Sequence, residues 1–210
     1  PLRLLSSHRV NRERRGYREL TQGMISLAAG DAARALRHAR KADTLLDNTI
    51  AGNLLIAQAA TLQGKTSLAK QHYEVMSDSD DAAIAGLRGL FEQAISDGDD
   101  DSAVRFGEKV RERQPDSEWV LLPLFELKVA RDDWAGADDV LAEALWRKVV
   151  TAEIGKRDRA FVLYERGISS LEQGDADVAI GYFREAHDLN PHFVPAATEY
   201  ARLLGDAGKK

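Results

Sequence analysis

A repeat with a period of 34 residues restricts the fold of this chain more than any other feature. Short breaks containing glycine or aspartate have their central residues at positions 30, 64, 98, 132 and 174. The first four breaks are spaced 34 residues apart, and the last interval carries eight extra residues. A unit of this length cannot bury its apolar face alone, so neighbouring units must stack. The period therefore predicts a linear array of similar units.

Small and apolar residues recur at fixed distances after each break. Offsets of five, nine and twelve residues mark one face of a helix, which is the second helix of each unit. The alanine column at the first offset predicts a close helix–helix contact, since two helices approach closely only where side chains are small. The three columns are Ala35, Ala69, Ala103, Ala137 and Ala179; Ala39, Tyr73, Gly107, Leu141 and Phe183; and Ala42, Met76, Val110, Ala144 and Ala186. Pro115 and Pro191 predict where second helices end.

The period and these columns together resemble the tetratricopeptide repeat family over residues 16–191. We therefore predict an all-α, right-handed solenoid of about five helical hairpins plus a C-terminal capping helix. The alternative is an ordinary helical bundle with coincidental spacing. The predicted boundaries are a basic lead-in at 1–15 and a repeat domain at 16–210, with repeats at 16–47, 48–81, 82–115, 116–149 and 158–191 and a capping helix at 192–207.

Two departures from the regular pattern predict local changes of shape. Pro123 lies inside the first helix of the fourth repeat, where it costs roughly 3 kcal/mol unless the helix starts late or kinks, so we expect a bend near Leu122. The eight extra residues are placed near 150–157. They are expected to lengthen the connection between the fourth and fifth hairpins.

Composition excludes several classes of function. The chain of 210 residues has no cysteine, which rules out disulfides, thiolate metal sites and cysteine nucleophiles. No stretch reaches the roughly 20 apolar residues that span a bilayer. The net charge is −5, yet residues 1–20 hold six arginines and two glutamates, so the remainder is acidic. An acidic body disfavours nucleic-acid binding, whereas a basic tip is typical of a segment beside a membrane.

No motif predicts catalysis or a metal site. Asp97, Asp99 and Asp101 alternate as in a calcium loop with Glu108 at the closing position, but Ser102 replaces the required glycine. The competing interpretation is that these aspartates cap a helix. The five histidines form no metal-ligand pair, and His38 and His72 are expected to be solvated. We therefore expect a protein that is not an enzyme and has no resident cofactor.

The concave surface is the candidate binding site, because the family lines this surface with the first helix of each repeat. Positions thirteen, ten and six residues before the breaks give a face that is mostly apolar and aromatic. Such a groove suits an amphipathic helix or hydrophobic segment of a partner better than a charged carboxylate clamp, although these residues could equally be core between repeats. The candidate partner-binding residues are Tyr17, Leu20, Met24, Leu54, Gln58, Arg88, Glu92, Trp119, Glu126, Phe161 and Tyr164.

Two segments resemble HemY-type proteins of Gram-negative bacteria. One is RRGYRELTQG at residues 14–23, which continues through AAGD at 28–31. The other is AHDLNP at 186–191, followed by VPAA at 194–197 and ARLL at 201–204. The resemblance implies an inner-membrane protein with two N-terminal membrane helices, a basic stretch and a cytoplasmic repeat domain, associated with haem (protoporphyrin) biosynthesis. Because the sequence begins without Met and in mid-pattern, we expect it to be a soluble fragment of that longer protein.

Three hypotheses for function remain open at this point. The first is a membrane-tethered scaffold whose groove docks other proteins, with haem-pathway enzymes as the candidate partners. The second is direct binding of haem or porphyrin in the groove, with Tyr17 or a histidine as axial ligand. The third is a general peptide-binding module of the bacterial envelope.

Overall fold

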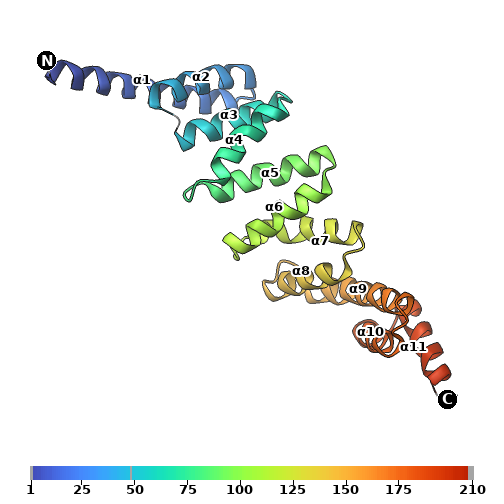
Figure 1. The fold of residues 1–210 in the computed structure, drawn as a ribbon. Coiled ribbons are helices and arrows are strands. Elements are labelled where there is room, and N and C mark those ends of the chain that lie inside the picture. The colour runs from blue at the N-terminus through green and yellow to red at the C-terminus, as the bar shows by residue number, and fades with distance from the viewer. Residues whose placement is uncertain (1, 48, 208–210) are drawn as a thin grey trace. The chain divides into compact units, whose positions relative to one another are not determined.

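The computed structural model describes residues 2–47 and 49–207, with side chains described for 9–47 and 49–206. These residues form eleven α-helices and one short 3-10 helix, and they contain no strand. The fold is therefore all-α, as predicted (Figure 1). The helices are α1 (Leu2–Ala28), α2 (Ala32–Leu46), α3 (Ile50–Leu62), α4 (Thr66–Ser77), α5 (Ala83–Asp97), α6 (Asp100–Arg113), η1 (Glu118–Val120), α7 (Leu121–Ala130), α8 (Trp134–Trp146), α9 (Ala152–Glu172), α10 (Ala176–Leu189) and α11 (Val194–Ala207).

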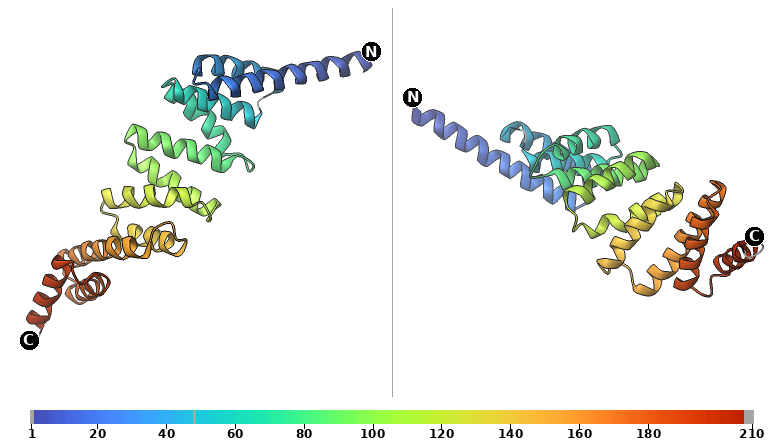
Figure 2. Two further views of the ribbon diagram at one scale, coloured as in Figure 1. Left: turned by 180° about the vertical axis from the view of Figure 1, so that it is seen from behind. Right: turned by 60° about the horizontal axis from the view of Figure 1, so that its bottom comes forward.

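The chain divides into two compact units, Pro1–Pro115 and Asp116–Lys210. The first unit contains α1 to α6 and the second contains η1 and α7 to α11. Within each unit every helix packs against the helix before it and the helix after it (Figure 2). The predicted hairpins are thus α1–α2, α3–α4, α5–α6, α7–α8 and α9–α10, and α11 packs on the last of them. No helix in the part of the chain that the structure describes is long and apolar enough to cross a membrane.

The turn inside each hairpin repeats one backbone motif. Its central residue has a positive φ in all five hairpins; four of these residues are glycines, and Asp132 is the fifth, with φ 56°. The amide after each central residue donates to a carbonyl five residues earlier, as in Asp31 N to Ser26 O at 2.9 Å. This is the pattern that ends a helix in a left-handed cap, and it explains why the breaks in the sequence keep their register.

Aspartates that follow these turns cap the second helices. The side chains of Asp31, Asp99 and Asp133 each accept a hydrogen bond from the amide three residues later. Asp99 accepts at 3.0 Å from the Ser102 amide, so this member of the acidic run is the N-cap of α6. A carboxylate here satisfies one of the unpaired amides at the start of the helix.

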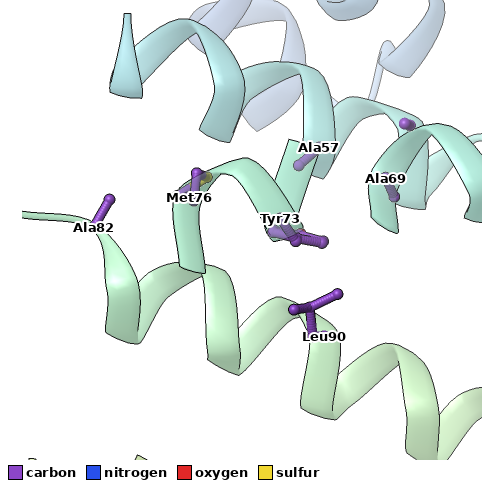
Figure 3. Packing of buried hydrophobic residues seen from close by; sticks show 7 residues of the cluster. Ala57, Ala69, Tyr73, Met76, Ala82 and Leu90 are labelled. Atoms are coloured by element: carbon purple, nitrogen blue, oxygen red, sulfur yellow. The ribbon is translucent and has the colours of Figure 1, made fainter. Parts of the chain in front are cut away.

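The alanine column forms the contact between the two helices of each hairpin, as predicted. Its five alanines are at most 1% exposed. The next two columns are also buried, and they include Tyr73 and Met76. Figure 3 shows these two side chains of α4 between Ala57 of α3 and Leu90 of α5, within one apolar cluster. Helix α4 therefore packs both within its own hairpin and against the next one.

Three expectations about helix boundaries are corrected or refined. The basic segment 1–15 is no separate lead-in, because α1 runs without a break from Leu2 to Ala28. The extra residues near 150–157 do not lengthen the connection; Thr151 caps a helix that starts at Ala152, so most of the insertion extends α9. Before Pro123 the chain forms η1 and then α7, which places the proline in the first turn of α7, where its missing amide needs no helical partner.

The expectation that His38 and His72 are solvated is wrong. Each is partly buried and lies against the first helix of its own hairpin. His38 Nδ1 is 2.7 Å from Glu19 Oε2, and His72 Nδ1 is 2.6 Å from Asn53 Oδ1. Each histidine faces the first helix of its hairpin, where its ring contacts a polar side chain 19 residues earlier in the chain.

Acid should weaken the second hairpin through His72. Burial lowers the pKa of His72 from its ordinary value of 6.5, so the folded state takes up this proton less readily than the unfolded state. The neutral His72 ring therefore contributes its full stabilisation above pH 6.5, and this stabilisation is lost as the pH falls below 6.5. Between about pH 7.5 and 5.5, we expect the wild type to lose more unfolding free energy in urea titrations than His72→Gln. Equal losses would show that this ring carries no such linkage.

Candidate functional site

An aromatic pocket lies in the second unit and is the candidate site. It has a volume of about 560 Å³, a size typical of ligand-binding clefts. Its apolar wall consists of Phe125 and Val129 of α7, Phe161 of α9 and Phe193, which lies just before α11. The polar residues on its lining are Arg157, Asp158, Asn190 and His192. The pocket thus lies along the first helices of the fourth and fifth repeats and reaches the start of α11.

Two aromatic pairs hold Phe161 and Phe193, two of the three phenylalanines of this pocket, in place. Phe161 meets the ring of Trp134 edge to face, with centroids 5.8 Å apart. Phe193 meets Tyr164 edge to face at 5.4 Å, and Tyr164 in turn packs on Phe183 at 5.6 Å. Burial raises the pKa of Tyr164, as expected for a phenol wedged between two rings. These two rings of the pocket wall are therefore held in position before any ligand arrives, which reduces the entropy cost of binding.

An ion cluster anchors the helix that carries Phe161. Arg159 Nε and Arg166 Nη1 donate to the two oxygens of Asp138 on α8 at 2.9 and 2.8 Å. Arg166 also donates to the Tyr182 hydroxyl of α10 at 2.7 Å. Asp138 is only 13% exposed, so these bonds are largely shielded from water. They tie α8, α9 and α10 together and fix the direction in which α9 presents Phe161.

The electrostatics of the pocket favour a ligand with little net charge. Arg157 pairs with the adjacent Asp158 at 3.0 Å, which neutralises the two charges on the lining. Asn190 and His192 add hydrogen-bonding groups beside the phenylalanines. Among the described side chains, no three of the His, Cys, Asp or Glu type gather as a metal site would require. The arrangement suits an apolar side chain presented by a short segment with a few polar groups.

The predicted site residues of the first unit are divided between solvent and the helix interface. Tyr17 and Met24 are 60% and 59% exposed on α1, whereas Leu20 packs against a buried cluster. Leu54 is likewise partly buried, and Gln58 of the same helix, α3, is exposed. On α5, Arg88 and Glu92 are exposed and pair with each other at 2.8 Å.

Of the predicted residues in the second unit, Phe161 alone lines the pocket. Tyr164 supports the pocket from behind, through Phe193. Trp119 lies in η1, partly buried, and Glu126 is exposed on α7. The structure therefore brings together one of the predicted residues and three apolar ones that the repeat pattern does not select.

Two of the three additional residues carry signals that are visible in the repeat alignment. Phe125 stands in a column where three other repeats have Gly23, Ala57 and Gly167 and a fourth has the buried Phe91. Phe193 stands where Thr49, Ser117 and Thr151 occur, the last residue before a helix in each case. Because Phe91 is buried core, a large ring in the column of Phe125 also serves packing, whereas the ring of Phe193 stands where the other repeats have small residues. Val129 carries no such signal.

The N-terminal part of the chain matches a known family. Residues 1–64 fit the family described as "HemY protein N-terminus". Similarity to solved structures shows the fold of the residues after 64. The chain has the tetratricopeptide repeat fold, and its residues 1–64 match the HemY protein N-terminus.

Several solved tetratricopeptide repeat proteins share this fold at low sequence identity. MamA AMB-1 has a TM-score of 0.56 at 17% identity, over 85% of this chain and 93% of that one. YrrB, described as a TPR protein with an unusual peptide-binding site, has 0.53 at 12% identity, over 86% and 89%. A thermophilic TPR protein of Thermus thermophilus has 0.51 at 16% identity, over 90% and 98%.

A curated relative matches part of the chain. Photosystem I assembly protein Ycf3 of Rippkaea orientalis is 33% identical over 78 residues. This match covers 36% of the present chain and 45% of that relative, so the chain spans under half the length of the curated protein. It supports the repeat assignment, and what Ycf3 assembles is a property of that protein.

Proposed function

We propose that this domain is a non-catalytic scaffold whose aromatic pocket docks a hydrophobic segment or amphipathic helix of another protein. The observation that supports this most strongly is the ordered wall of Phe125, Phe161 and Phe193 beside few polar groups. Aromatic anchors in partly desolvated pockets supply most of the free energy in many protein interfaces. YrrB offers a precedent, since its description names a peptide-binding site on the same fold.

The match to the HemY protein N-terminus supports a more specific form of the proposal. In this form the full-length protein is tethered to the bacterial inner membrane, with the repeat domain in the cytoplasm, and it gathers enzymes of haem or protoporphyrin biosynthesis. Holding successive enzymes on one scaffold would raise their effective concentration for each other and for a poorly soluble porphyrin. Ycf3, an assembly protein by name, is consistent with a role in bringing proteins together.

Capture from a bacterial lysate tests this proposal. The immobilised domain should enrich one or more haem-pathway enzymes, and Phe161→Ser should reduce that capture at least about tenfold, because removal of an anchoring aromatic ring costs about 2 kcal/mol or more. Phe161 is 41% exposed, so the substitution should leave the fold intact. Trp146→Ser is the matched control, because Trp146 is 77% exposed and lies outside the pocket. Capture that is the same for both variants, or that yields no haem-pathway enzyme, contradicts the proposal.

A further inference from the structure

Helix α1 has one face against its hairpin and another face in solvent. Gly16 and Gly23 are buried, and a Cβ on Gly16 would meet Leu46 of α2. Val10 and the residues four, seven, eight and eleven positions after it lie together on the opposite side of the helix. All five are exposed, and they are Val10, Arg14, Tyr17, Arg18 and Thr21. Apolar, aromatic and cationic side chains therefore alternate on a surface that no other helix covers among those described.

The arginines of this segment differ in how their charge is compensated. Arg9 pairs with Glu13 at 3.1 Å, and Arg12 donates to the Thr44 carbonyl at 2.8 Å. Arg14, Arg15 and Arg18 form no ion pair with any side chain of residues 9–47 or 49–206. Three exposed cations without an ion pair thus lie within five residues, in a chain whose net charge is −5. Arg14 and Arg18 lie on the exposed face, and Arg15 lies beside it within the electrostatic reach of Glu19.

We infer that this face of α1 lies on an anionic lipid surface. Arginine side chains would contact the lipid phosphates, while Val10 and Tyr17, which are 47% and 60% exposed, would enter the boundary between headgroups and acyl chains. Tyrosine favours that boundary because it has an apolar ring and a polar hydroxyl. Nucleic acid would use the arginines but would leave Val10 in water. The acidic remainder of the chain would repel a long polyanion.

This inference rests on the membrane-associated role proposed above and adds a second attachment that the repeat domain makes by itself. Each arginine near an anionic surface contributes on the order of a fivefold gain in affinity, so three of them together should contribute about a hundredfold. The attraction should weaken as salt is added, since screening acts on exposed charges within about a Debye length.

Vesicle flotation with the whole chain tests the inference. The chain should float with vesicles of phosphatidylcholine mixed with phosphatidylglycerol and should stay unbound with phosphatidylcholine alone. Replacing Arg14, Arg15 and Arg18 with glutamine should lower the affinity for the anionic vesicles about a hundredfold. Lys70, Lys109 and Lys156 replaced with glutamine form the matched control, because the charge change is identical and all three lie outside α1.

The outcomes distinguish binding of this face to anionic lipid from a general effect of charge and from binding to nucleic acid. Loss of binding in the arginine variant with retention in the lysine variant supports the inference, and further loss in Val10→Ser places that side chain in the boundary. Equal loss in both variants, or no binding to anionic vesicles, overturns it. Tighter binding to duplex DNA than to vesicles at the same salt concentration overturns it as well. None of these results depends on Phe161, so failure here leaves the partner-docking proposal standing and can be told apart from its failure.

Discussion

Phe183→Ala should lower the free energy of unfolding of the second unit by about 3 to 5 kcal/mol, the range for removing a buried phenylalanine. Phe183 has no exposed surface, and its ring fills the space between α9, α10 and α11 in a cluster with Ala179 and Leu203. Gly167 of α9 sits directly under the ring, so no neighbouring side chain can expand into the cavity from that side. Loss of the ring also removes a support of Tyr164, which holds Phe193 in the pocket wall.

Tryptophan fluorescence in a urea titration measures this effect selectively. The chain has three tryptophans, Trp119, Trp134 and Trp146, and all belong to the second unit. Val178→Ala is a suitable control, because this α10 side chain is 44% exposed and its loss should change the unfolding free energy by less than about 0.5 kcal/mol. A loss of unfolding free energy below about 1 kcal/mol for Phe183→Ala would show that the ring does not fill the core between α9, α10 and α11.

Gly86→Ala should destabilise the first unit by about 1 to 3 kcal/mol, as overpacking does. A Cβ at this position of α5 would come within 3.0 Å of three backbone atoms of α4, in Tyr73, Met76 and Ser77. Backbone cannot rotate away as a side chain can, so the two helices must separate. This cost exceeds the roughly 1 kcal/mol by which alanine favours a helix over glycine.

Amide hydrogen exchange of α4 and α5 measures that loss directly. The same substitution at Gly181 of α10 is the matched control, because nothing lies within 4 Å of its Cβ position. Gly181→Ala should therefore gain about 0.5 to 1 kcal/mol of protection in α10. Unchanged exchange of α4 and α5 in Gly86→Ala would contradict the close contact between these helices.

The sequence predicted the features that depend on backbone geometry alone. A left-handed turn every 34 residues requires glycine or a tolerant residue such as Asp132, and the close crossing of two helices requires alanine at a fixed distance. Both requirements recur in every hairpin and are therefore visible as columns. The end of α10 before Pro191 follows for the same reason.

Features that depend on a single hairpin were harder to predict. The inserted residues extend α9 because Thr151 caps it and residues 152–157 continue as helix, a local signal that competed with the expectation of a loop. His38 and His72 lie in a column whose partner is 19 residues away, where Glu19 and Asn53 supply polar groups. Sequence spacing identified the histidines but not the partners that draw them inward.

The candidate site likewise combines features that recur in every repeat with features that occur in a single repeat. Positions on the inner face were predicted from the family register, and Phe161 was among them. The pocket itself depends on Phe193, an exception to its column, and on Phe125, which shares a ring only with Phe91 in its column. It also depends on contacts between rings far apart in sequence. An average over repeats hides such exceptions, although each is visible when one repeat is compared with the others.

Hydrogen exchange of the domain with and without its captured partner is the most direct test of the central claim. If the aromatic pocket docks the partner, protection should rise in α7, in the N-terminal half of α9 and in the segment 190–193. The same experiment with Phe161→Ser should show no such rise at equal protein concentrations. Protection that appears only in α1 to α6, or that survives in Phe161→Ser, would show that the partner binds elsewhere.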